Sequence, residues 1–175
     1  MSMLLTLVLT TVFVPQLPTS RAQEGLLLMK EEVFTAVVGQ IVDGDSLVVR
    51  EGQQNIHIHL DGIDAPELAQ TGGAEAKAFL DEFAQGQNVI VHLRRRGRAT
   101  EEGLARVELR GMDLSVELVR RGLAWYCPRQ VDDADLVAAE RSAQEAKRGI
   151  WSVSGPMPPW RYRGTNACWQ ERVGS

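Results

Sequence analysis

The chain has 175 residues, of which 44% are hydrophobic, so it can bury one core of ordinary size. Its 19 Lys and Arg residues against 23 Asp and Glu residues give a net charge of −4. This balance excludes general electrostatic attraction of nucleic acid, so a polyanion would have to meet a local group of basic side chains.

The N-terminus has the pattern of an export signal. Residues 4–14 form an apolar run of 11 residues, which is shorter than the roughly 20 residues that span a bilayer. Ser20 and Ala22 place small residues at the third and first positions before a cut after residue 22. We expect a signal peptide over 1–22, a linker over 23–32, export to the periplasm or the medium, and no membrane span. The alternative is a disordered or wrongly assigned start, since no Lys or Arg precedes the apolar run.

Three strands are predicted next. Residues 33–42 are rich in β-branched side chains, and residues 46–50 follow an Asp-Gly-Asp turn. In residues 55–60 the apolar side chains alternate with His57 and His59, which is typical of a half-buried strand.

The second half of the domain mixes helices and strands. Apolar residues at positions 76, 79, 80 and 83 predict a helix that Gly86 ends. Strands are expected over 88–93 and 104–109, joined by an arginine-rich turn. Helices are expected over 113–122, with Asp113 as its cap, and over 132–148.

Five strands and three helices in this order predict an α+β fold, a small five-stranded OB-fold barrel with helices packed outside it. We expect this domain to span residues 33–152. Three prolines after residue 155 predict an extended tail over 153–175, with Trp160 and Tyr162 on the domain surface.

Two acidic segments carry the chemistry. Asp43-Gly44-Asp45-Ser46 occupies the turn between the first two strands, and Gly62-Ile63-Asp64-Ala65-Pro66-Glu67 follows the third strand. Carboxylates at adjacent strand ends can converge on one hard cation such as Ca²⁺, and a further carboxylate can take a proton from an attacking water. Either segment alone is better explained by solvated loop acids.

Together with three further stretches, these segments resemble the staphylococcal nuclease (thermonuclease) family, exported bacterial type. The stretches are Glu75-Ala76, residues 118–125 (LVRRGLAW) and residues 146–151 (AKRGIW), and Pro159-Trp160-Arg161 is similar to the tail of exported members. The resemblance implies an OB barrel and a phosphodiesterase that acts on DNA or RNA with calcium. It assigns Asp45 and Asp64 as metal ligands, Ala65 as a backbone-carbonyl ligand, and Glu67 as the general base.

The family pattern also contains two catalytic arginines, and this sequence departs from it at both. His59 stands five residues before Asp64, where the first arginine belongs, and Glu102 stands where the second belongs. A guanidinium can hold two phosphoryl oxygens at once, whereas His59 offers one donor and Glu102 repels phosphate. Losing one such donor commonly costs about 10²–10³ in rate. The alternative function is therefore an inactive OB-type module that binds nucleic acid or metal.

A basic group lies near the predicted turn, and we predict that it contacts single-stranded DNA or RNA. Its members are Arg94, Arg95, Arg96, Arg98 and Arg106. The alternative is that these are solvated surface charges. We also weigh a transition-metal site at His57 and His59, with His92 nearby, against exposed strand histidines, which we prefer.

The two cysteines, Cys127 and Cys168, predict either one disulfide, as suits an exported chain, or two separate buried thiols. There is no Cys-x-x-Cys pair in the sequence, so a zinc ribbon is excluded. We expect a monomer.

Overall fold

A computed structural model describes residues 31–96, 102–128, 130–165 and 168. The chain divides into two units, residues 1–30, which lie outside the described part, and residues 31–175. The expected signal peptide, most of the linker, and Arg98 therefore fall outside the described residues. The second unit holds the barrel, the helices and the C-terminal tail.

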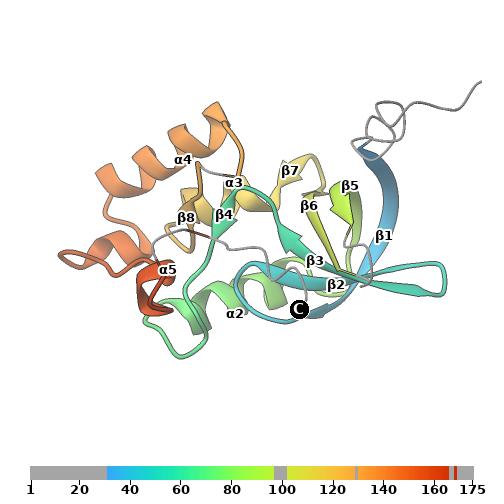
Figure 1. The fold of residues 1–175 in the computed structure, drawn as a ribbon, viewed down its shortest axis with the longest axis horizontal. Coiled ribbons are helices and arrows are strands. Elements are labelled where there is room, and N and C mark those ends of the chain that lie inside the picture. The colour runs from blue at the N-terminus through green and yellow to red at the C-terminus, as the bar shows by residue number, and fades with distance from the viewer. Residues whose placement is uncertain (1–30, 97–101, 129, 166–167, 169–175) are drawn as a thin grey trace, which may run out of the picture. The chain divides into compact units, whose positions relative to one another are not determined.

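Five long strands form the barrel, which confirms the predicted OB-type α+β fold (Figure 1). They are β1 (Glu32–Ile41), β2 (Ser46–Glu51), β3 (Gln54–Leu60), β5 (Asn88–Arg96) and β6 (Glu102–Leu109). The strand order is β3-β2-β1-β5-β6, and a parallel pairing of β3 with β6 closes the sheet on itself. The short β7 (Met112–Asp113) pairs antiparallel with β6 at the edge of the sheet.

The inward face of these strands forms the core. Side chains alternate along each strand, so every second residue points inward. Leu47 and Val49 of β2, Ile58 of β3, Val91 of β5 and Val107 of β6 are fully buried there. The alternation also turns His57 and His59 to the other face of β3, where both are only partly buried.

Helices cover the barrel and extend from it (Figure 1). They are α2 (Gly73–Phe83), α3 (Leu114–Arg120), α4 (Ala134–Glu145), the 3-10 turn η1 (Gly149–Ser152) and α5 (Pro159–Tyr162). Asp113 caps α3 as expected, by accepting from the backbone N–H of Ser115 and Val116. The prediction for α4 was too long, because Asp133 caps the helix at its start and Lys147 adopts a positive φ just beyond its end.

The tail also differs from prediction. Pro159 does not keep it extended but starts α5, since proline suits the first position of a helix. The ring of Trp160 then packs edge-on against Trp125, with centroids 6.4 Å apart, whereas Tyr162 stays exposed.

Two glycines bring α3 and η1 together. Gly122 ends α3 with φ of 71°, and its carbonyl accepts from the Ile150 N–H at 2.9 Å. A Cβ atom at either Gly122 or Gly149 would overlap the other segment's backbone. The motifs around residues 118–125 and 146–151 therefore form one structural unit.

A second, two-stranded sheet connects the barrel to the helices. β4 (Ile63–Asp64) pairs antiparallel with β8 (Trp125–Tyr126), so that Asp64 lies opposite Trp125. No helix in the described part of the chain is long and apolar enough to cross a membrane.

Candidate active site

Local backbone contacts set the position of Asp45 in the turn between β1 and β2. Its N–H donates to the Asp43 carboxylate at 3.1 Å, a turn geometry that Asp side chains commonly support. A Cβ atom on Gly44 would lie 2.7 Å from Ala76 Cβ and 2.8 Å from Ala65 Cβ, so only glycine permits this approach. The contact presses the turn against the segment that follows β4.

That segment carries the other predicted acids. Asp64 ends β4, and its side chain is only 2% exposed. The N–H of Ala65 donates to Asp45 Oδ2 at 2.7 Å, which joins the two acidic segments directly. Pro66 fixes its own φ, and Glu67 follows with a side chain that is 36% exposed.

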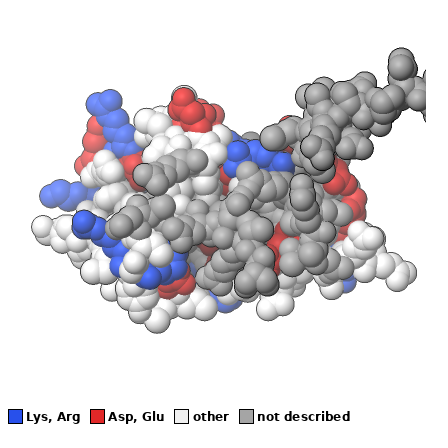
Figure 2. All heavy atoms as spheres, viewed as in Figure 1, with Lys and Arg blue, Asp and Glu red and all other residues white. Residues whose placement is uncertain are grey.

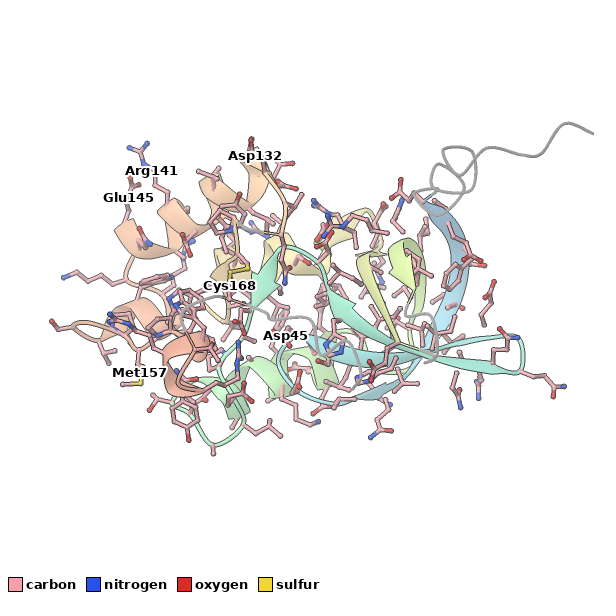
Figure 3. All side chains as sticks on the ribbon, in the orientation of Figure 1. Asp45, Asp132, Arg141, Glu145, Met157 and Cys168 are labelled. Atoms are coloured by element: carbon pink, nitrogen blue, oxygen red, sulfur yellow. A yellow bond between two sulfur atoms is a disulfide. The ribbon has the colours of Figure 1, made fainter. Side chains whose placement is uncertain are left out.

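One pocket of about 300 Å³ collects these groups. Among its lining residues are Asp45, Asp64, Ala65, Glu67, His59 and Arg163. Figure 3 shows Asp45 near the centre of the molecule, at the turn that leads into β2. The structure therefore brings together the carboxylates whose convergence the strand positions predicted, along with Ala65 and His59, which the family resemblance had assigned to the site.

Negative charge is crowded around Asp45. Desolvation by the surrounding protein raises the pKa of Asp45 well above its ordinary value, and repulsion from Asp43 and Asp64 raises it further, against a lowering contribution from the Ala65 N–H. A cation among these oxygens would relieve the repulsion. The two carboxylates and the Ala65 backbone carbonyl are hard oxygen donors of the kind that Ca²⁺ accepts, so the residues present would fit this ion.

Arg163 is the site residue that the sequence analysis missed. It follows α5, and its Nη2 donates to Asp64 Oδ2 at 2.7 Å. Its Nη1 donates to Glu67 Oε1 at 2.7 Å and to Asp64 Oδ1 at 3.1 Å. The hydrogen bonds to Asp64 and Glu67 raise the pKa of Arg163 despite partial burial. The motif Pro159-Trp160-Arg161 was the nearest sequence signal, and it stops two residues short.

The residues in place of the family arginines are not equivalent in position. His59 lines the pocket, and its Nδ1 lies 3.1 Å from Ser46 Oγ, which contacts Asp45 Oδ1 at 3.3 Å. Glu102 is not among the pocket's described lining residues. It lies beside His57 across the β3–β6 pairing, 3.8 Å from the His57 ring.

The predicted arginine group is divided in the structure. Arg94 pairs with the buried Asp61 at 2.6 Å, and burial of Asp61 raises the pKa of that carboxyl even so. Arg106 forms ion pairs with Asp113 and Asp133 and is not among the residues that line the pocket.

The backbones of Arg95 and Arg96 form the end of β5. On the face in Figure 2, Lys and Arg atoms lie in separate groups among acidic ones.

The structure also shows how the two histidines of β3 and the two cysteines are arranged. The rings of His57 and His59 lie 4.9 Å apart. Within the described residues, no group of three or more His, Cys, Asp or Glu side chains is arranged to hold a metal ion.

Cys127 and Cys168 form a disulfide, visible beside β4 in Figure 3. Such bonds persist in oxidising compartments.

Residues 57–153, more than half of the chain, match the family described as Staphylococcal nuclease homologue. The chain belongs to this family. The match begins within β3 and ends just after η1, so it includes Asp64 and Glu67 but neither Asp45 nor Arg163.

Three of the curated proteins that are similar to this chain carry nuclease names. An "Uncharacterized endonuclease" of Escherichia coli O157:H7 is 31% identical over 126 residues, covering 72% of this chain and 82% of the relative. An "Uncharacterized endonuclease" of Haemophilus influenzae is 31% identical, covering 75% of this chain and 74% of the relative. A "Micrococcal nuclease" of Shigella flexneri is 30% identical, covering 74% of this chain and 80% of the relative.

Proposed function

We propose that this protein is an exported, calcium-dependent nuclease that hydrolyses phosphodiester bonds in DNA or RNA, preferring single strands. The observation that carries the proposal is the meeting of Asp45, Asp64, Ala65 and Glu67 in one pocket. Family membership and the nuclease names of the relatives support it. The Cys127–Cys168 disulfide supports export, because an oxidising compartment preserves such bonds.

Each residue then has a role in the reaction. Calcium would be held by the carboxylates of Asp45 and Asp64 and by the Ala65 carbonyl; when bound, it supplies positive charge to the phosphoryl oxygens. Glu67 accepts a proton from water as the water oxygen forms its bond to phosphorus. The opposite P–O ester bond breaks, its electron pair leaves with the ester oxygen, and solvent protonates that oxygen.

The geometry of Glu67 suits a general base. Its side chain is 36% exposed, against 2% for Asp64, so water can reach it more readily than the neighbouring metal ligand. Pro66 restricts the backbone between Asp64 and Glu67, which holds the two carboxylates in a set relation.

A calcium-versus-chelator assay on the full chain tests the proposal. We expect cleavage of single-stranded DNA in calcium and none after chelation. Asp45→Asn should lower the rate by about 10²-fold or more, and Glu67→Gln by about 10²–10⁴-fold. Asp132→Asn is the matched control, because Asp132 is an exposed acid just before α4. Absence of cleavage by the wild type at high enzyme concentration would refute the proposal.

Calcium binding can be measured without activity. A ligand that binds only the folded state stabilises it, by about 2.7 kcal/mol at a concentration of 100 times Kd. We therefore expect calcium to raise the Tm of the wild type, of Asp132→Asn and of Glu67→Gln, but not of Asp45→Asn.

The second candidate is an OB module that binds nucleic acid or metal without turnover. The observation that favours it is the placement of His59 in the pocket, where the family pattern has an arginine. It predicts calcium-dependent oligonucleotide binding with no product, and turnover lost in Glu67→Gln would eliminate it.

A further inference from the structure

The active-site pocket contains a positive charge that comes from the tail rather than from the barrel. Arg163 lies with one nitrogen on Asp64 and the other shared between Asp64 and Glu67, at 2.7–3.1 Å. A quarter of its side chain is exposed. A group that touches both a proposed metal ligand and the proposed base also lies beside the position of the reacting phosphate.

Arg94 and Arg106 of the barrel do not fill this position. Arg94 is paired with Asp61 and with the Gln130 carbonyl. Arg106 is paired with two carboxylates outside the pocket. Of the described residues that line the pocket, Arg163 is the sole Lys or Arg. The chemistry needs a cation that binds phosphoryl oxygens, and Arg163 is the lining residue of the described structure that can supply it.

Contacts on both sides of Arg163 build its position into the fold. Upstream, Trp160 packs on Trp125, which pairs with Asp64 across β4 and β8. Downstream, the disulfide joins Cys168 to Cys127, two residues beyond Trp125. The tail is thus fixed twice to the strand that neighbours Asp64, once before and once after Arg163.

A third anchor lies at the approach to α5. The Gln70 amide donates to the Met157 carbonyl at 2.6 Å, and the Gln70 carbonyl oxygen accepts from the Glu67 N–H at 3.2 Å. The tail is therefore connected through one side chain to the backbone of the general base. Figure 3 shows Met157 at α5 and Cys168 beside β4, on either side of the segment that carries Arg163.

We propose that Arg163 is a catalytic residue that binds the phosphoryl oxygens of the scissile phosphodiester and replaces the arginines absent from the barrel. The inference rests on the proposed nuclease function. In the structure the guanidinium bonds the carboxylates of Asp64 and Glu67, and it transfers to the phosphate when nucleic acid and calcium enter. The opposite role is a plug, in which Arg163 only competes with calcium for Asp64.

The two roles predict opposite kinetics for Arg163→Ala. As a phosphate ligand, its loss lowers kcat at saturating calcium by about 10²–10³-fold. As a plug, its loss leaves kcat at saturating calcium unchanged and lowers the calcium concentration for half-maximal rate. Arg163→Lys should recover part of the rate, because an ammonium keeps the charge but not the two-pronged grip.

The matched control is Arg161→Ala. Arg161 is exposed on the same short helix, so its removal changes the net charge equally while leaving the pocket intact. We expect its kcat to stay within about twofold of wild type, as surface changes usually do. Unchanged kcat in Arg163→Ala, or equal losses in both variants, would overturn the inference.

A binding measurement separates failure of this inference from failure of the nuclease proposal. Fluorescence anisotropy with a labelled single-stranded DNA oligonucleotide is measured in calcium, in the Glu67→Gln background. We expect Arg163→Ala to weaken binding about tenfold and Arg161→Ala to leave it nearly unchanged. If the wild type fails to cleave but this loss is seen, the phosphate contact stands. Equal binding by all three proteins would refute it.

Discussion

At the scale of single residues, Glu140 is an acid outside the pocket whose burial affects the stability of the fold. Glu140 of α4 accepts a 3.0 Å hydrogen bond from the Tyr126 N–H, yet burial raises the pKa of Glu140 because no cation compensates it in the described structure. When the folded state raises the pKa of an acid, the free energy of unfolding falls as pH rises from the acid's unfolded pKa to its folded pKa.

Glu140→Gln should therefore stabilise the protein near pH 7. The amide oxygen can still accept from the Tyr126 N–H, while the buried charge is gone. We expect Tm to rise by a few degrees at pH 7 and to change little near pH 4, where Glu140 is protonated. Glu145→Gln is the control, because Glu145 is exposed and paired with Arg141. A variant less stable than wild type at pH 7 would contradict this reading.

At the scale of elements, Arg106 of β6 connects two helix starts. Its guanidinium bonds Asp113 Oδ2 at 2.5 Å and also bonds Asp133. These aspartates are the N-caps of α3 and α4. Burial alone would raise the pKa of Asp133, but hydrogen bonds from Arg106 and the α4 backbone outweigh it and lower that pKa.

Arg106→Met should destabilise the fold by about 1.5–3 kcal/mol at pH 7, the usual value of hydrogen bonds to charged groups. When the folded state lowers the pKa of an acid, that acid stabilises the fold at pH values above its unfolded pKa. This stabilisation is lost as pH falls through its folded-state pKa. The difference from wild type should therefore shrink below pH 4 in denaturant titrations. Arg141→Met, an exposed control, should change stability little. A loss that persists unchanged at low pH would exclude the charge interaction as its cause.

The helices and strands that were predicted correctly are those whose pattern is encoded by residues close together in the sequence. Strand alternation and the Asp113 cap are encoded within a few residues, so the barrel strands and α3 were found. The end of α4 and the start of α5 depend on a positive φ at Lys147 and on Pro159 entering a helix. Both depend on contacts with distant segments as much as on local sequence, and both were misjudged.

The site residues likewise divide into those that local motifs could predict and those that depend on distant contacts. Asp45, Asp64 and Glu67 belong to two short motifs whose strands are neighbours, so their meeting follows from the predicted sheet. Arg163 meets Asp64 across a separation of 99 residues. The path of the tail depends on a disulfide and two tryptophans, and no local pattern at residue 163 signals a phosphate ligand. For Arg106, spacing placed the side chain on a strand face but could not reveal its two carboxylate partners.

At the scale of the whole molecule, the disulfide connects stability to the active site. It joins residues separated by 41 positions, and a crosslink of that span adds about 3–4 kcal/mol in the loop-entropy account. Cys168 also lies five residues after Arg163, and Cys127 donates its N–H to the Gly62 carbonyl beside β4. Opening the bond should therefore loosen the tail on the downstream side of Arg163, while the upstream contacts of Trp160 and Met157 and the barrel's hydrogen bonds stay in place.

Reduction, or the double change Cys127→Ser and Cys168→Ser, should lower both Tm and kcat. The value of kcat, measured well below the lowered Tm, should fall between those of wild type and Arg163→Ala, because the upstream contacts of Trp160 and Met157 remain and hold the guanidinium in part. Groups that act as one unit do not give additive losses. Combining the serine changes with Arg163→Ala should therefore cost little further kcat, whereas Tm should still fall by the disulfide's full contribution. Multiplicative losses of kcat would show that the disulfide and Arg163 act independently.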